Sequence, residues 1–146
     1  MDNMLIQVKG VKKIIFFAPS DIDYLYMRGD KSEIIDVENT DLIEYPLFVN
    51  AQKYETDLMP GDVVFIPALW LHNVVCKTFS IGVNVFWKHL DEAFYDKNDL
   101  YGNKDLVGAC KALDSTKRSL KELNNLPKDY KDFYIRRMIQ ILKENL

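Results

Sequence analysis

Short apolar runs separated by turn-forming residues fill the first 90 residues, and this pattern is typical of β-strands. The runs lie at residues 4–8, 12–18, 54–58, 63–66, 69–76 and 80–87. Gly10 separates the first two runs, and the sequence M-P-G-D at residues 59–62 predicts a tight turn before the fourth. We therefore expect a β-rich body over residues 1–90.

Residues 28–53 interrupt this pattern with mixed polar and apolar positions. We expect a short strand at residues 33–37 and, around it, an ordered loop that packs on the surface. Before this segment, Ser20 or Asp21 is expected to cap a short helical turn through residues 24–26.

The last third of the chain changes to an apolar spacing near 3.6 residues, which predicts amphipathic helices. The first apolar face consists of Leu106, Cys110, Leu113, Leu120 and Leu123. The second consists of Tyr130, Phe133, Tyr134, Met138, Ile141 and Leu142. Asn124, Asn125 and Pro127 separate the two, and Pro127 can occupy the first turn of the second helix. We expect a helical hairpin over residues 106–146, joined to the β-rich body by a connecting segment at residues 91–105. The fold class is thus mainly β with a C-terminal α-helical part.

Composition narrows the class of protein. Of 146 residues, 48% are apolar and 28% are charged, which is typical of a soluble globular domain. No segment reaches the roughly 18 apolar residues of a membrane span. The first ten residues do not resemble a signal peptide. The two cysteines form no C-x-x-C pair, so we expect the cytosol or nucleus rather than secretion.

The charge is unevenly distributed along the chain. Residues 1–107 carry ten Lys and Arg against seventeen Asp and Glu, whereas residues 108–146 carry nine against five. A basic C-terminal part indicates either a nucleic-acid partner or an ordinary solvated helix surface. The candidate RNA-binding residues are Lys117, Arg118, Lys121, Arg136 and Arg137.

His72 is the first candidate for chemistry. It follows the turn at residues 59–62 and an apolar strand, an order that small cupin-type barrels use to point an imidazole inward. Imidazole is a common metal ligand, although a lone histidine can equally be structural. The sequence H-L-D at residues 89–91 has the spacing of an iron-binding pair, but it follows the last strand, so we expect it to lie outside a barrel.

Four further polar residues lie within apolar strands or at the start of one. Lys12 and Lys13 point to opposite sides of one strand, so one of them must face the interior, where it would bind an anion. The alternative is a lysine that protects a sheet edge. Asn84 is expected to be buried and to bond either a ligand or the backbone. Asn3 is either a site residue or part of a frayed terminus.

Two stretches of this sequence resemble JmjC-domain Fe(II)/2-oxoglutarate oxygenases. They are D-N-M-L-I-Q-V-K-G-V-K-K at residues 2–13 and P-G-D-V-V-F-I-P-A-L-W-L-H-N-V at residues 60–74, and V-N-V-F-W-K-H at residues 83–89 extends the match. The sequences Y-D-K-N-D-L-Y-G-N-K-D and L-P-K-D-Y-K-D-F-Y-I-R-R-M resemble the branch that hydroxylates the wybutosine side chain of phenylalanine tRNA.

The resemblance implies a cupin-like double-stranded β-helix that uses Fe(II) and 2-oxoglutarate. By this resemblance, His72 is an iron ligand, and Lys12 pairs with the far carboxylate of 2-oxoglutarate. Asn3 and Asn84 lie beside this cosubstrate. The C-terminal helices form a homodimer, and the substrate is tRNA.

The sequence departs from the family pattern in one respect. The family's H-x-D iron-binding pair precedes the position of Asn3, and this chain starts at Met1 without it. We therefore expect an N-terminally truncated JmjC barrel with open sheet edges that is inactive alone. Two other functions remain open: a hydroxylase of protein side chains, and a non-catalytic form that acts through its helices.

Overall fold

Two compact units make up the chain in the computed structural model, which describes residues 1–99 and 104–146. Met1–Glu92 belongs to the first unit, and Ala93–Asn98 with the C-terminal helices belongs to the second. Residues 100–103, part of the expected connecting segment 91–105, lie outside the described residues.

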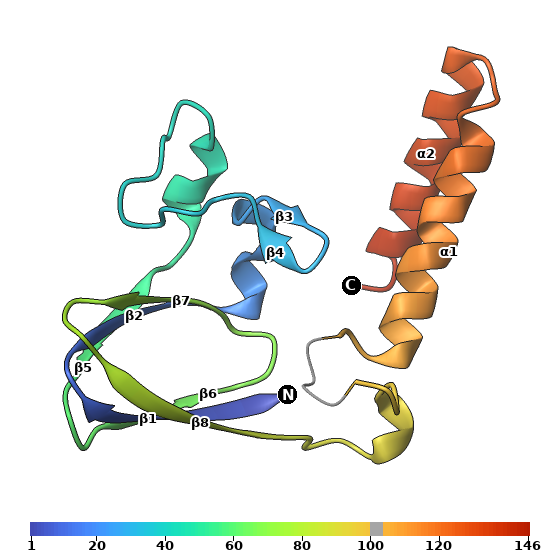
Figure 1. Ribbon diagram of the computed structural model, residues 1–146. Coiled ribbons are helices and arrows are strands. Elements are labelled where there is room, and N and C mark those ends of the chain that lie inside the picture. Colours follow the sequence, from blue (N-terminus) through green and yellow to red (C-terminus); the bar gives the residue numbers. More distant parts are fainter. Residues whose placement is uncertain (100–103) are drawn as a thin grey trace. The chain divides into compact units, whose positions relative to one another are not determined.

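The first unit contains two antiparallel three-stranded sheets that lie face to face (Figure 1). One sheet has the order β6-β1-β8, and the other has the order β5-β2-β7. Their bounds are β1 Asp2–Lys9, β2 Lys12–Phe17, β5 Tyr54–Leu58, β6 Val63–Ile66, β7 Leu71–Cys76 and β8 Ile81–Trp87. β1 is followed by β2 in the opposite sheet, and the chain changes sheets again at each step from β5 to β8. The six strands expected for the β-rich body are all present, and the mainly β fold with a helical end is confirmed.

Glycines at two connections explain how the chain changes sheets. Gly10 has φ +73° and lies against Phe79, whose carbonyl oxygen would be 2.1 Å from a Cβ at this position. Gly61 has φ +96° in the predicted turn, where the Met59 N–H donates to Asp62 Oδ2 at 2.7 Å. Only glycine adopts such φ values at little cost, so both turns are encoded locally.

The core between the sheets is formed by Leu5 and Ile66 from one sheet and by Ile14 and Leu58 from the other. Side chains alternate along a strand, so Ile15 points to the opposite side of β2 from Ile14. Ile15 packs there in a second cluster with buried residues from β2 and the following segment, Phe17 and Leu25. Both isoleucines are completely buried, because β2 is covered on both faces.

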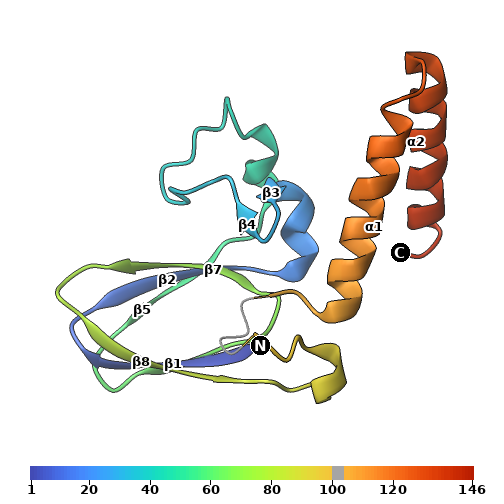
Figure 2. The ribbon, with the colours of Figure 1, turned by 45° about the vertical axis from the view of Figure 1, so that its right-hand side comes forward.

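The segment after β2 provides the cover on this second side. It contains the 3-10 helices η1 (Pro19–Tyr24) and η2 (Pro46–Asn50) and the short hairpin of β3 (Met27–Arg28) and β4 (Lys31–Ser32). Figure 2 shows this segment on the side of β2 and β7 away from the other sheet. The irregular segment is thus an ordered surface element that completes the second core cluster.

Two local expectations for this segment are wrong. The short strand lies at Lys31–Ser32 and not at residues 33–37, because the Asp36 carboxylate accepts the N–H groups of Glu38 and Asn39 at 3.1 Å each. Such local bonds compete with strand pairing. Ala18 and not Ser20 or Asp21 occupies the N-cap of η1, and Asp21 instead accepts the Gln52 N–H at 2.9 Å.

The outer face of the sheet β6-β1-β8 is apolar and partly exposed. Phe65 and Trp87 stack on this face with ring centroids 5.8 Å apart. The other half-exposed members are Val63, Val83 and Val85. Within the described residues, β5, β6, β7 and β8 each have a paired neighbour on one side only. The four edge strands therefore offer unpaired backbone groups.

The second unit consists mainly of two antiparallel helices, α1 (Val107–Leu123) and α2 (Lys128–Lys143). They are preceded by the 3-10 helix η3 (Glu92–Phe94), which begins at the last residue of the first unit's main segment. Pro127 is the N-cap of α2 and so lies just before its first turn. The apolar faces predicted for these helices remain largely exposed, with Phe133 and Ile141 more than half accessible. None of the described helices combines the length and apolar character of a membrane span.

Candidate functional site

The residues predicted from the sequence to bind a metal or an anion face the space between the two sheets. Residues directly opposite each other in an antiparallel pair point to the same face. Leu5 lies opposite Asn84, and Ile14 and Phe16 alternate with Lys12 along β2, with His72 opposite Phe16. Leu5 and Ile14 pack in the core between the sheets, so their faces are the interior ones. The interior residues of interest are Asn3, Gln7, Lys12, His72, Gly82 and Asn84.

His72 lies on β7, where its ring is 6.4 Å from that of Phe16. Its Nδ1 atom is 3.1 Å from the Trp70 carbonyl oxygen. A carbonyl can only accept, so this contact favours the tautomer with the proton on Nδ1. The Nε2 lone pair is then available, which is the arrangement found in histidines that bind metals. The ring is also solvent-exposed and therefore accessible to a ligand.

The loop between β6 and β7, which carries the chain to His72, is held by Asp2. The Asp2 Oδ1 atom accepts the Ala68 N–H at 2.8 Å, and its Oδ2 atom lies 3.2 Å from Nδ1 of His89. Leu69 has φ +69° in this loop, an unfavourable value for a leucine. His89 is thus engaged by Asp2 after the end of β8, as expected for a residue outside the barrel.

A metal centre of the facial type takes two histidines and one carboxylate. Among residues 1–99 and 104–146, no group of three or more His, Cys, Asp and Glu side chains could hold a metal ion. His72 is the one imidazole at the interior face. The described residues therefore do not by themselves fit an iron centre, and we derive no step through a metal.

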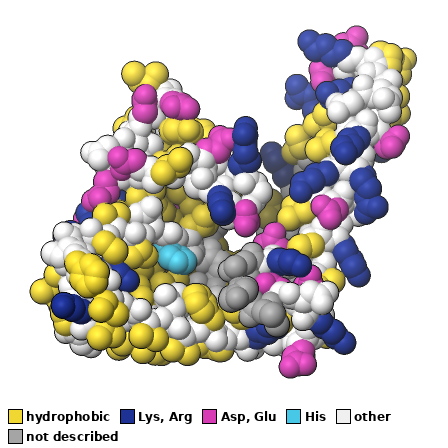
Figure 3. All heavy atoms as spheres, viewed as in Figure 1, with side chains coloured by type: hydrophobic (Ala, Val, Ile, Leu, Met, Phe, Trp, Pro, Cys, Tyr) yellow, Lys and Arg dark blue, Asp and Glu magenta, His cyan; other side chains and the backbone are white. Residues whose placement is uncertain are grey.

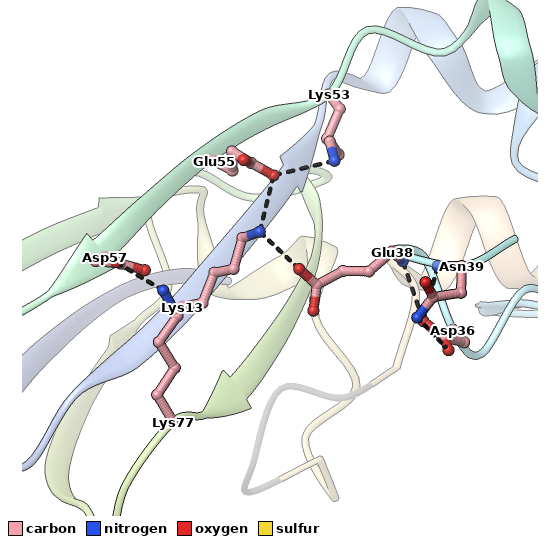
Figure 4. A network of polar contacts seen from close by, with 8 residues as sticks. All are labelled: Lys13, Asp36, Glu38, Asn39, Lys53, Glu55, Asp57 and Lys77. Atoms are coloured by element: carbon pink, nitrogen blue, oxygen red, sulfur yellow. Dashed lines mark hydrogen bonds and ion pairs between the residues drawn. The ribbon is translucent and has the colours of Figure 1, made fainter.

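Lys13 points to the outside of the sheet β5-β2-β7, where it joins a network of charges (Figure 4). Its Nζ atom is 2.6 Å from Glu38 and 3.2 Å from Glu55, and Lys53 lies 3.0 Å from the same Glu55 carboxylate. The bond to Glu38, and after it the bond to Glu55, raises the pKa of Lys13. Lys53, and then Lys13, lowers the pKa of Glu55. Lys13 is therefore the surface lysine of the pair.

Lys12 points between the sheets and reaches across to β8. Its Nζ atom lies 2.9 Å from the point where a Cβ on Gly82 would be. Within the described residues it has no ion-pair partner. β2 is the central strand of its sheet, so the alternative of an edge-protecting lysine is wrong. A cation without a counter-ion in the interior is suited to bind an anion.

Asn3 and Asn84 meet beside this lysine. The Asn3 Nδ2 atom donates to Asn84 Oδ1 at 3.2 Å, while Asn3 Oδ1 is buried without a hydrogen-bond partner. Asn3 is only 6% exposed, so it is not part of a frayed terminus. Asn84 is exposed and not buried as expected, because β8 is an edge strand whose other side is open.

Gln7 is an interior residue that was not among the candidates predicted from the sequence. It is 1% exposed, and its Oε1 atom is buried without a hydrogen-bond partner. The sequence contained evidence for this position. Gln7 is the single polar residue in the first apolar run, and it is an even number of residues from Asn3. Period-two alternation places both on the interior face.

The basic residues of the helices lie in the second unit, where Figure 3 shows Lys and Arg side chains along the hairpin. Lys117, Arg118 and Lys121 line an open depression on α1 together with Asp114. Lys117 lies 3.7 Å from the Asp114 carboxylate, and Arg137 lies over the Phe133 ring at 6.0 Å. Arg136 is also on α2. These exposed cations provide a basic surface on the hairpin.

Comparisons with known proteins agree with this architecture. Residues 1–93 match the family described as a cupin-like domain. The chain is 54% identical over 139 residues to tRNA wybutosine-synthesizing protein 5 of Homo sapiens, covering 95% of this chain and 44% of that protein. It is 51% identical to the protein of the same name from Gallus gallus, covering 99% of this chain and 45% of that protein.

A more distant relative is tRNA wybutosine-synthesizing protein 4 of Gibberella zeae, 32% identical over 94% of this chain and 14% of that protein. The chain thus spans less than half the length of the vertebrate relatives. The family match covers both sheets and every interior residue described above. This chain therefore belongs to the cupin-like domain family.

Proposed function

We propose that this chain takes part in tRNA modification, in the synthesis of wybutosine. The specific reaction we propose is hydroxylation of the wybutosine side chain in phenylalanine tRNA, with Fe(II) and 2-oxoglutarate. The observation that carries the proposal is the position of Lys12, a cation without a described counter-ion that points into the cupin-like interior. The names of the relatives, which match nearly the whole chain, support the tRNA pathway.

In this proposal, Lys12 binds the far carboxylate of 2-oxoglutarate. Asn3 and Asn84 offer amide N–H groups to the same molecule from the opposite sheet, since the bond between them uses a single N–H of Asn3. If a metal is bound there, His72 would hold it through Nε2. His72 is the one imidazole at the interior face of the described residues, so an iron centre would need ligands in addition to it.

The matched pair Lys12 and Lys13 provides the first test. We expect Lys12→Met to abolish detectable binding of 2-oxoglutarate in a calorimetric titration, and Lys13→Met to retain it, because only Lys12 faces the interior. Methionine keeps most of the aliphatic length while removing the charge. Equal losses in the two variants would contradict the assignment of the anion site.

We propose tRNA contact through Lys117, Arg118, Lys121, Arg136 and Arg137. Neutralising phosphates makes binding strongly salt-dependent. Changing Lys117, Arg118 and Lys121 to Glu should weaken binding of phenylalanine tRNA and flatten its dependence on salt. The control changes Lys53 and Lys77, exposed cations of the first unit, to Glu. If the unchanged chain binds a candidate peptide substrate and does not bind phenylalanine tRNA, hydroxylation of a protein side chain becomes the better-supported function.

We also propose that the exposed apolar sides of α1 and α2 form a homodimer. Phe133, Ile141 and Leu142 are each more than half exposed, which is unfavourable for an isolated hairpin. Sedimentation equilibrium should show a dimer that Phe133→Asp and Ile141→Asp convert to a monomer. Replacing the exposed Ile43 of the first unit with Asp should leave the dimer intact. A wild-type monomer would rule this interface out.

A non-catalytic role through the helices remains the competing function. It predicts that the chain binds a partner through α1 and α2 while Lys12→Met has no effect on any ligand. For either function we place the protein in the cytosol or nucleus.

A further inference from the structure

A small polar recess surrounds Gly82 at the interior end of Lys12. A Cβ added to Gly82 would lie 2.9 Å from Lys12 Nζ, 3.3 Å from Gln7 Oε1 and 3.3 Å from the Ile6 carbonyl oxygen. These atoms come from β2 in one sheet and from β1 in the other. The ammonium group of Lys12 thus occupies space that any other residue at position 82 would fill.

The amide of Gln7 is held in one orientation. Its Nε2 atom lies 2.7 Å from the Lys9 carbonyl oxygen, 2.8 Å from the Gly10 carbonyl oxygen and 2.9 Å from Ser80 Oγ. Carbonyl oxygens only accept, so the NH₂ group must face them and Oε1 must face the recess. This buried oxygen has no hydrogen-bond partner. The recess therefore contains an unused acceptor beside an ammonium group with three donors.

The recess has a fixed spacing from the paired asparagines. Gly82 and Asn84 are two residues apart on β8 and face the same side. Two residues of a strand span about 6.8 Å. Because Lys12 Nζ lies beside Gly82, it is separated from Asn84 by about this length of β8, which an extended five-carbon dicarboxylate can bridge with one carboxylate at each end.

We propose that Gly82 sets the length of the dicarboxylate that the interior accepts. This inference rests on the proposed function and adds the residue that selects five carbons over four. The missing side chain lets the Lys12 ammonium lie against β8, and the Gln7 oxygen favours that retracted position. With a side chain at position 82, Nζ must move by roughly 0.6–1 Å to reach ordinary contact distance. β8 blocks one direction, so Nζ moves into the interior and shortens the site.

The substitution is compatible with folding. Gly82 lies within a regular strand and is not among the glycines with positive φ. The closest atom to the added Cβ is the end of a flexible lysine, which can move at little cost. Gly82→Ala should therefore change the site while preserving the unfolding midpoint.

The experiment measures equilibrium binding of 2-oxoglutarate and of the four-carbon oxaloacetate by ligand-observed NMR, with the whole chain. We expect Gly82→Ala to weaken 2-oxoglutarate binding by about fivefold or more and to change oxaloacetate binding by less than about twofold. Gly82→Ser should lower the ratio of the two affinities at least as far. Gly108→Ala, in α1 with open space around the added Cβ, is the matched control.

The outcomes separate this inference from the proposed function. If the wild type binds 2-oxoglutarate, Lys12→Met abolishes binding and Gly82→Ala leaves the ratio unchanged, the anion site stands and the role of Gly82 is wrong. If the wild type binds neither dicarboxylate, or binds them equally well with and without Lys12, both the anion site and the role of Gly82 are wrong. Suppose instead that Gly82→Ala lowers the ratio of the 2-oxoglutarate affinity to the oxaloacetate affinity, and that Lys12→Met abolishes 2-oxoglutarate binding. This result supports both the anion site and the role of Gly82.

Discussion

Asn3 and Asn84 lie 81 residues apart in the chain and are joined by a hydrogen bond of 3.2 Å from Nδ2 of Asn3 to Oδ1 of Asn84. They belong to the neighbouring strands β1 and β8 and point into the space between the sheets. The bond therefore fixes two polar groups at the interior face where Lys12 also ends.

The first prediction concerns the charge at this pair. Asn84→Asp keeps an acceptor for Asn3 Nδ2 but adds a negative charge to the interior face, so 2-oxoglutarate should bind more weakly by at least roughly tenfold. Even the carboxylate at the Lys12 end, about 7 Å away, would be repelled by about 2 kcal/mol at an effective dielectric constant of about 20, and the carboxylate at the Asn84 end lies closer. Calorimetric titration measures the affinity.

The control is Asn73→Asp, which adds the same charge to the other face of β7, opposite Ile15. Its affinity for 2-oxoglutarate should change less than that of Asn84→Asp. Equal effects of the two substitutions would argue against a ligand at the interior face.

The second prediction compares two glycines that both have positive φ. Gly10→Ala should destabilise the chain by about 3 kcal/mol or more, because the strained backbone and the overlap with the Phe79 carbonyl oxygen add up. Gly61→Ala should cost only about 1–2 kcal/mol, because open space surrounds its added Cβ. Chemical denaturation gives both values, and similar losses would show that the close approach at Gly10 is not required.

The third prediction concerns Leu69, which is 79% exposed and has φ +69° in the loop before His72. Leu69→Gly should stabilise the chain by about 0.5–1 kcal/mol, because relief of an unfavourable backbone conformation exceeds the added freedom of the unfolded state. Thermal unfolding measures the change.

Tyr26 is the matched control for Leu69, since its φ of +49° is also positive. Its hydroxyl accepts the Leu47 N–H at 2.9 Å, and its ring packs 5.0 Å from that of Tyr45. Tyr26→Gly should therefore destabilise the chain. A loss of stability in Leu69→Gly would mean that the leucine side chain makes a contact that outweighs the strain.

The fourth prediction concerns pH. Because Lys53 and then Lys13 lower the pKa of Glu55 in the folded chain, its contribution to stability is present above the unfolded pKa of 4.5. That contribution is lost as the pH falls through the lower folded pKa. Glu55→Gln should therefore reduce the loss of stability measured by denaturation between pH 5 and acid, a range of about 2–3 pH units.

Lys13, in the same network, should make stability depend on pH at the alkaline end of the range. Glu38, followed by Glu55, raises its pKa, so its contribution is present below the unfolded pKa of 10.5 and is lost as the pH rises through the higher folded value. Lys13→Met should reduce the loss of stability that the wild type shows at alkaline pH. It should leave the packing of Ile14 between the sheets unchanged. A wild type whose stability is independent of pH at both extremes would contradict the network.

The sequence by itself determined the local elements of this protein. Alternating apolar residues fixed the strands, glycines with a required positive φ fixed the turns at Gly10 and Gly61, and apolar residues every 3.6 positions fixed α1 and α2. Each of these depends on residues close together in the chain. The predicted strand at residues 33–37 failed for the same local reason, because the Asp36 carboxylate bonds the next backbone N–H groups.

Only the tertiary structure decided which residues share the interior. Alternation shows that Lys12 and Lys13 oppose each other, but the packing of Ile14 against Leu5 of the other sheet selects Lys12 as the inward one. Strand order made Asn84 exposed on the edge strand β8 and buried Gln7 on the central strand β1. These properties depend on contacts between segments that are far apart in the chain. A pattern of neighbouring residues does not contain the energy of such contacts.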